Sequence, residues 1–290
     1  MMQVCATRAA ALSARSPALL LSRSLAVKPS VGNIKELRKR TDLPMKLCRQ
    51  ALAESSDDVN AAMEWLKNNE EARAQMVKDK LAGRAAAEGR VGVLTSPTAA
   101  ALVKVNCETD FVARNDEFVS MVDEITESCM RMMQQRDTST EFVTLTDEEL
   151  ASLPVASGTA KTLIDAALST HGENLQLSQA CGVHAPDTCV LGSYSHNNGS
   201  YAAVICLQAD APVSSLPQSA QDVLKTTADA LAKNVVAVEP EAEEGQSVLD
   251  ALRTQALVFS PDHTVRDELA RAGKDASTTL DVVSFVRWQK

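Results

Sequence analysis

Asn106–Asn115 reads NCETDFVARN and joins an expected strand to an expected helix. Residues 101–105, just before it, are nearly all apolar and include two valines, which is typical of a strand packed on at least one face. Asn115 can cap the helix that follows, where apolar residues recur every three to four positions at Phe118, Val119, Val122, Ile125 and Cys129. The turn between strand and helix is therefore Thr-Asp-Phe at 109–111.

The Thr-Asp-Phe turn has an ordinary structural interpretation when its residues are read alone. Phe111 would be a core residue, because large aromatic side chains are mostly buried, and Asp110 would cap the following helix. In that interpretation the turn only connects a strand to a helix. An exposed aromatic side chain offered to a partner is the alternative, and it needs support from the rest of the chain.

The composition is that of a folded chain with an aliphatic core. Of 290 residues 45% are hydrophobic, enough for one large or two to three small domains, and only five Phe, two Trp and two Tyr occur. No run of about 18 apolar residues is present, so the sequence predicts no membrane-spanning helix. Seven Cys form no CxxC pair and no zinc-type spacing with His, and we expect reduced, buried thiols.

The first thirty residues differ from the rest because they contain no Asp or Glu and four basic residues, Arg8, Arg15, Arg23 and Lys28. This composition predicts a mitochondrial transit peptide over 1–30 and a location in the mitochondrial matrix. A secretory signal is the alternative, but its apolar segment, Pro17–Leu21, would be short. Without these four cations the formal charge changes from -9 to about -13 for residues 31–290, which argues against a phosphate-binding surface.

Three short amphipathic helices are predicted within residues 31–70. The first is expected to have Asn33 as its cap, and the third is expected to begin at Ser56 or Asp57. Their apolar stripes are Ile34 and Leu37; Met45, Cys48 and Leu52; and Val59, Ala62, Met63 and Leu66. Such helices can close a three-helix bundle of the ubiquitin-associated kind, followed by a polar linker helix over 71–88.

The remaining sequence predicts a duplicated α+β core with antiparallel sheets, because two strand hairpins are each followed by a helix. The first half is expected to have strands at 89–94 and 99–105, a helix to about 135 and a short helix after Thr146. Next come a helix at 162–168 that stops at Gly172 and a strand at 175–184. The second hairpin has strands at 189–194 and 201–207 and is followed by a helix at 219–233, an acidic loop at 239–244 and a closing strand at 280–288. We therefore expect one core subdomain over 89–160 and another over 161–290.

Several blocks of the chain resemble the elongation factor Ts family, the guanine-nucleotide exchange factors of elongation factor Tu. NCETDFVARN at 106–115 is similar to the signature of that family, and VLGSYSH at 190–196 is similar to a second block. The helical sequence at 34–67 resembles the amino-terminal module of the family in order and spacing. Supporting matches are GEN at 172–174 and FVRW at 285–288.

The resemblance implies a function and a site. A family member binds Tu in its GDP form and promotes GDP release and exchange for GTP, here in mitochondrial protein synthesis. In the family the Phe of the turn intrudes near the magnesium and phosphate region of Tu, and the resemblance transfers this role to Phe111. The expected contact residues for Tu are Asn106, Cys107, Thr109, Asp110, Phe111, Val112, Arg38, Met45 and His196. We expect no enzyme activity, no cofactor or metal, no direct binding of nucleotide or nucleic acid, and no membrane contact.

Two places depart from the family pattern. Asp42-Leu43-Pro44 stands where the family has a small-residue turn, so the contact expected of Met45 does not transfer in detail. Ser178 and Gln179 stand where relatives carry a basic pair.

Enzymatic and adaptor functions are the alternatives to nucleotide exchange. No GxxxxGK[ST] loop occurs, so the chain is not expected to hold the nucleotide itself, and no GxSxG, HExxH or GxGxxG motif marks a catalytic site. A ubiquitin-associated-like adaptor without exchange activity is one alternative. A thiol hydrolase with Cys107 as nucleophile and His184 or His196 as base is another, although Cys107 directly follows an expected buried strand.

Overall fold

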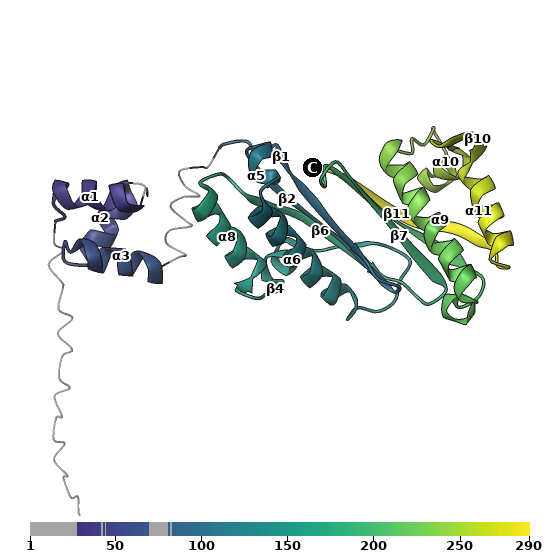
Figure 1. The fold of residues 1–290 in the computed structure, drawn as a ribbon, viewed down its shortest axis with the longest axis horizontal. Helices are drawn as coiled ribbons and strands as arrows, with labels where there is room; N and C mark the ends of the chain where they lie inside the picture. The colour runs from purple at the N-terminus through teal and green to yellow at the C-terminus, as the bar shows by residue number, and fades with distance from the viewer. Residues whose placement is uncertain (1–27, 42, 44, 70–80, 82) are drawn as a thin grey trace, which may run out of the picture. The chain divides into compact units, whose positions relative to one another are not determined.

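A computed structural model describes residues 28–41, 43, 45–69, 81 and 83–290 (Figure 1). The chain forms two compact units, Met1–Trp65 and Leu66–Lys290. The expected transit peptide at 1–30 lies almost entirely outside the described residues. Most of the expected linker helix at 71–88 also lies outside them, and residues 84–87 are not helical.

The three predicted amino-terminal helices are present as α1 (Val31–Thr41), α2 (Met45–Glu54) and α3 (Val59–Asn68). Their inner faces are buried and aliphatic, and they consist of Ile34, Leu37, Leu47, Cys48, Ala51, Leu52 and Ala62. Each helix is too short to be stable alone in water, so this shared burial is what holds them. The predicted three-helix bundle is confirmed.

The caps of two of these helices differ from those expected. α1 begins two residues before Asn33, whose N–H donates to the Ser30 hydroxyl at 3.2 Å, so Ser30 is the cap. α3 begins after Asp58, whose carboxylate accepts from the Ala61 N–H at 2.8 Å. Residues 56–57, where this helix was expected to start, have positive φ angles of 52° and 64°. Such a left-handed conformation ends a helix and cannot begin one.

The second unit contains two antiparallel sheets of three or four strands. The first has the order β1-β2-β6-β3, with β1 (Glu88–Thr95), β2 (Ala99–Cys107), β6 (Gln176–His184) and β3 (Val143–Thr144). The second has the order β11-β8-β7, with β11 (Leu280–Gln289), β8 (Tyr201–Ala209) and β7 (Cys189–His196). The predicted α+β class with antiparallel sheets is confirmed.

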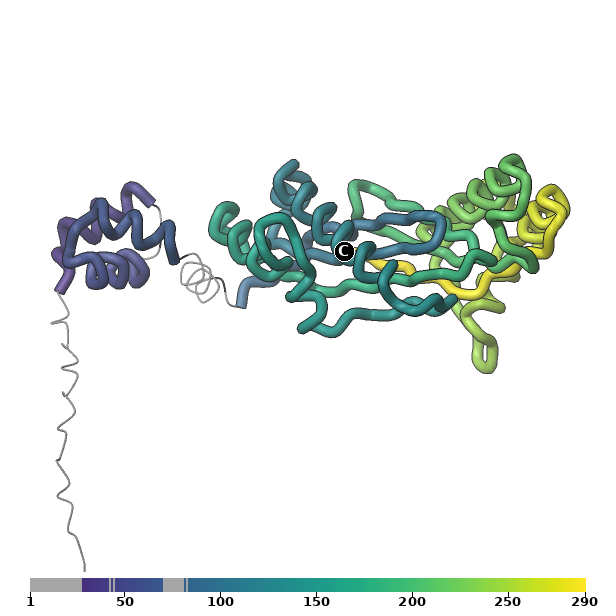
Figure 2. The backbone as a smooth tube through the Cα atoms, turned by 90° about the horizontal axis from the view of Figure 1, so that it is seen from below, coloured from purple at the N-terminus to yellow at the C-terminus, as the bar shows by residue number. Residues whose placement is uncertain are grey.

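The two sheets face each other, and each carries helices on its outer face (Figures 1 and 2). The first sheet is covered by α5 (Asp110–Ala113), α6 (Asp116–Met133), α7 (Asp147–Ser152) and α8 (Ala160–His171). The second is covered by α9 (Gln218–Ala237), α10 (Val248–Thr254) and α11 (Val265–Asp275). Two short ribbons, β4 (Pro154–Val155) with β5 (Gly158–Thr159) and β9 (Ala256–Leu257) with β10 (Ser260–Thr264), and the 3₁₀ turn Val213–Ser215 complete the unit.

β2 is the strand that carries the chain to the Thr-Asp-Phe turn, and it is buried on both faces. Every residue of β2 except Lys104 is buried, because one face packs on α6 and the other meets the second sheet. A strand covered on both faces shows a continuous apolar run in place of alternation, as this one does. The predicted cap of the next helix is confirmed, since Asn115 Oδ1 accepts from the Glu117 N–H at 2.8 Å.

The strand expected at 175–184 lies in the first sheet and not in a second repeat. β6 pairs with β2 from Ala99 opposite His184 to Asn106 opposite Gln176. α8 likewise packs into the cluster beneath the first sheet. A boundary at residue 160 would therefore separate α8 and β6 from the first sheet, to which they belong. The second hairpin, β7 with β8, and the helix α9 form the other layer without them.

The ends of several elements agree with the sequence. Gly172 caps α8 with a left-handed φ of 67°, as predicted, and the acidic stretch after α9 is an exposed loop apart from Pro240. α10 and the β9–β10 ribbon were not expected, because their short sequences lack a clear period.

Candidate partner-binding site

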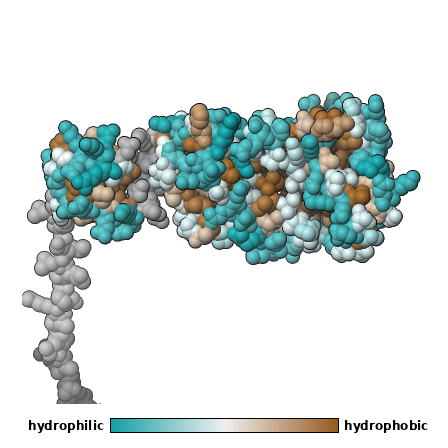
Figure 3. All heavy atoms as spheres, viewed as in Figure 1, coloured by the Kyte–Doolittle hydropathy of each residue, from teal (hydrophilic) through white to brown (hydrophobic). Residues whose placement is uncertain are grey.

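Phe111 is the most exposed large apolar side chain among the described residues, with 83% of its surface accessible. It is the second residue of α5 and belongs to none of the hydrophobic clusters. Figure 3 shows an apolar group standing out from the surface over α5. The interpretation of Phe111 as a core residue is therefore wrong.

Thr109, and not Asp110, caps the helix of the turn. Thr109 has the extended conformation of a cap (φ -125°, ψ 152°), and its hydroxyl accepts from the Val112 N–H at 3.4 Å. Asp110 is the first helical residue, and its carboxylate lies 3.5 Å from the Arg114 guanidinium on the exposed side. The expected capping role of Asp110 is thus taken by its neighbour, and the Asp110 carboxylate faces solvent beside Phe111.

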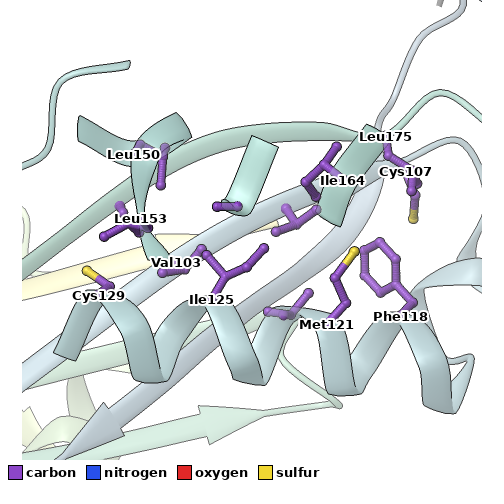
Figure 4. Packing of buried hydrophobic residues seen from close by; sticks show 14 of the residues in the cluster. Val103, Cys107, Phe118, Met121, Ile125, Cys129, Leu150, Leu153, Ile164 and Leu175 are labelled. Atoms are coloured by element: carbon purple, nitrogen blue, oxygen red, sulfur yellow. The ribbon is translucent and has the colours of Figure 1, made fainter. Parts of the chain in front are cut away.

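The base of the turn is part of the core of the first sheet. Ala113 is buried, Val112 packs against the same cluster, and Phe118 at the start of α6 is fully buried. Figure 4 shows Phe118 and Met121 together at the end of this cluster near Cys107. The exposed ring of Phe111 therefore stands on a packed base.

Asn106 and Cys107 lie beneath the surface that the turn presents. The Asn106 amide donates to the Glu88 carbonyl at 3.0 Å and accepts from the Ser178 hydroxyl at 2.6 Å. The Cys107 thiol donates to the Thr109 carbonyl at 3.2 Å. Both side chains are therefore engaged in hydrogen bonds within the chain.

The arrangement contradicts the thiol hydrolase alternative. Burial, with a smaller effect from the nearby Glu173 carboxylate, raises the pKa of the Cys107 thiol from 9.0 to about 12, so no thiolate forms at neutral pH. His184 pairs with Ala99 at the opposite end of the nine-residue strand β2, roughly 25 Å from Cys107. Since Cys107 is fully buried, His196, an exposed residue, cannot reach it with a substrate between them.

His196 belongs to a second surface feature, a pocket of about 340 Å³ lined by Tyr194, His196, Tyr201, Lys233, Val236, Ala237, Phe259 and Arg287. The Tyr194 hydroxyl lies 3.4 Å from His196 Nδ1, and Lys233 Nζ lies 4.3 Å from the centre of the Phe259 ring. Phe259 is 69% exposed, and Figure 3 shows apolar side chains on the surface near α10. Phe259 is not among the contact residues expected from the sequence, and the available signal was a single Phe just before the polar stretch Ser260–Thr264.

Arg38 and Met45 are surface residues of the first compact unit. Met45 is 49% exposed, and Leu47 takes the place on the inner face that the apolar stripe had assigned to Met45. The side chain is thus accessible, as a contact residue must be.

The structure adds residues from distant sequence to the turn. Glu173 and Asn174, within the GEN stretch, hydrogen bond to Thr109 and Glu108. The sequence marks GEN as a family block but predicts no contact for it, because nothing local shows which segment will lie beside it. Across the described ranges, no group of three or more His, Cys, Asp or Glu side chains could hold a metal ion, and no helix is long and apolar enough to cross a membrane.

Fold and site together define an α+β protein that presents an aromatic turn from a packed base. A family model described as Elongation factor TS matches residues 108–251. The chain is 30% identical to Elongation factor Ts of Brucella anthropi, with 89% of this chain and 91% of the relative covered. It is 32% identical to the same factor of Rhodopseudomonas palustris strain TIE-1 (86% and 73% covered) and of Sphingopyxis alaskensis (86% and 74%). The chain belongs to the elongation factor Ts family.

Proposed function

We propose that this member of the elongation factor Ts family binds elongation factor Tu in its GDP form and promotes release of GDP and its exchange for GTP in mitochondrial protein synthesis. The observation that carries the proposal is Phe111, an aromatic ring held 83% exposed on a packed turn. Transfer of such a ring from water into an apolar slot of a partner is favourable by about 1.5–3 kcal/mol.

Exchange follows from the coupling between two binding events. An exchange protein binds its GTPase more tightly when nucleotide is absent than when it is present. By reciprocity, it must weaken the binding of nucleotide to the GTPase by the same ratio. A ring that enters the region next to the magnesium and phosphates supplies that difference, because the slot it fills is available only when those groups have moved.

Asp110 is suited to assist Phe111. Its ion pair with Arg114 joins two exposed side chains, and such surface pairs contribute about 0–1 kcal/mol. The carboxylate can therefore leave Arg114 at little cost and compete in the partner for groups that serve the magnesium ion. Thr109 and Val112 fix this turn, while Arg38, Met45 and His196 provide further contacts.

GDP release from Tu tests the proposal directly. Fluorescent GDP bound to Tu is mixed with this chain in a stopped-flow instrument, and the wild-type chain should accelerate release. Phe111→Ala should slow the stimulated release by about tenfold or more, since it removes the ring that separates the two states. Val248→Ala, which shortens another exposed apolar side chain, is the matched control and should behave as wild type. An adaptor without exchange activity would leave release unchanged in all three cases.

The mitochondrial location is part of the same proposal and rests on the acid-free, basic composition of residues 1–30. A fluorescent protein fused behind residues 1–40 should enter mitochondria. Replacing Arg8, Arg15 and Arg23 by Glu in the fusion should keep it in the cytosol, and a cytosolic wild-type fusion would refute the location.

A further inference from the structure

The polar groups of Thr109 converge on one carboxylate. The Thr109 N–H donates to Glu173 Oε2 at 3.1 Å, and the Thr109 hydroxyl donates to Glu173 Oε1 at 2.7 Å. Both oxygens of Glu173 are thus engaged by the residue that caps α5. Hydrogen bonds to an ionised acceptor are about twice as strong as neutral ones, which makes this a firm attachment.

The attachment is reciprocal. Glu108 Oε1 accepts from the Asn174 N–H at 2.7 Å, so each segment uses a carboxylate to hold a backbone N–H of the other. The Asn174 amide donates to the Arg84 carbonyl at 2.9 Å, and the Arg84 guanidinium lies 3.3 Å from Glu108. Residues 108–109 and residues 173–174, far apart in sequence, are therefore joined through both members of each pair.

The topology explains why Glu173 reaches Thr109. Gly172 ends α8 in a left-handed conformation and turns the chain toward β6. β6 begins opposite the end of β2, with Gln176 paired to Asn106. The residues just before β6 must therefore lie beside those just after β2, and Glu173 faces the cap of α5.

A helix as short as α5, with four residues, does not maintain its own geometry, because nucleation of a helix is unfavourable and few bonds follow. Its orientation depends on groups outside it. We propose that Glu173 is a positioning residue for Phe111: by holding both polar groups of Thr109, it fixes the turn in the orientation in which the ring enters the partner. This inference rests on the proposed exchange function and adds a residue of the GEN stretch to its machinery.

The test compares Glu173→Ala with Glu149→Ala, a control that removes a similar pair of Thr–Glu bonds elsewhere together with an ion pair to Arg136. Glu149 accepts from the N–H and hydroxyl of Thr146 at 2.9 and 3.1 Å, in the cap of α7. Glu173→Ala should slow stimulated GDP release from Tu by about tenfold to a hundredfold at saturating factor, as expected when a reacting group is misplaced. With Glu149→Ala, GDP should leave Tu at the rate that the wild-type chain produces. Glu173→Gln keeps one acceptor oxygen and should give an intermediate rate, and it replaces the Ala variant if melting shows that variant to be unfolded.

A double-mutant cycle with Phe111→Ala separates positioning from a general structural role. If Glu173 acts through the ring, Glu173→Ala should cause no further slowing in the Phe111→Ala background. Two outcomes would overturn the inference while Phe111→Ala still slowed release. One is that Glu173→Ala slows stimulated GDP release equally in the wild-type and Phe111→Ala backgrounds, and the other is that folded Glu173 variants stimulate release at the wild-type rate. If wild type failed to accelerate release, or Phe111→Ala released normally, the proposed function would fail first and the inference with it.

Discussion

Phe111 and Phe118, seven residues apart on consecutive helices, have opposite environments: Phe111 is 83% exposed and Phe118 is fully buried against the first sheet. Phe118→Ala should lower the free energy of unfolding by about 3–5 kcal/mol, because it leaves a cavity in the core. Phe111→Ala should change it by less than about 0.5 kcal/mol. Urea titrations of the two variants test this, each serving as the control for the other, and a large loss for Phe111→Ala would show that its ring packs within the chain.

Thr109 and Asp110 should separate stability from exchange. Thr109→Ala removes the cap of α5 and the contacts with Glu173, and it should cost at least about 1 kcal/mol in the free energy of unfolding. Asp110→Ala removes only an exposed ion pair, so its melting temperature should stay near that of wild type while stimulated GDP release slows. A melting temperature for Asp110→Ala as low as that of Thr109→Ala would return the capping role to the carboxylate.

The buried thiols should make stability fall at alkaline pH. Burial raises the pKa of Cys107 and of Cys129 to about 12, while an unfolded chain loses these protons near pH 9. Above pH 9 the unfolded state therefore binds fewer protons than the folded state, and the free energy of unfolding decreases by up to about 1.4 kcal/mol per pH unit for each thiol. Between pH 6 and 8 these two thiols should not make the free energy of unfolding depend on pH.

Alkylation checks the same property residue by residue. At pH 8 iodoacetamide should modify Cys107 and Cys129 in urea but not in the folded chain, as measured by mass spectrometry of digested samples. Rapid labelling of Cys107 in the folded chain would contradict its burial.

Gly192 should be essential for the packing of α9 on β7. A Cβ at this position would lie 2.1 Å from the backbone carbonyl carbon of Ala228, which cannot move independently of its helix. Gly192→Ala should therefore cost about 1–3 kcal/mol in the free energy of unfolding. Ser195→Ala, an exposed change on the same strand, is the control and should be close to neutral. Equal melting temperatures for the two variants would disprove the close approach.

The first unit should contribute affinity for Tu more than it contributes to release. It is compact with its own core, and a separate binding module raises affinity through the local concentration it creates. Removing residues 31–70 should weaken binding, measured by calorimetry, and leave GDP release near the wild-type rate at high factor concentration. Unchanged affinity after the deletion would refute this role.

The sequence predicted local features better than pairings between distant segments. Asn115 and Gly172 mark helix ends through their own chemistry, so their roles could be read directly and are confirmed. β6 was expected in a second repeat because it follows the first repeat in sequence, and this placement was wrong. Its pairing with β2 depends on contacts between distant segments, which the order of elements along the chain does not show. Exposure of Phe111 was undecided by pattern, since a single aromatic residue in a turn has no period to show which side it faces.

The tie between Thr109 and Glu173 also sets an order of events during synthesis. The two residues are 64 positions apart. At about 5–20 residues per second, the ribosome needs roughly 3–13 seconds to make the segment between them. During that interval Phe111 is already part of the growing chain, but the carboxylate that binds its helix cap does not yet exist. An incomplete chain that ends before Gly172 thus carries the aromatic residue without its anchor.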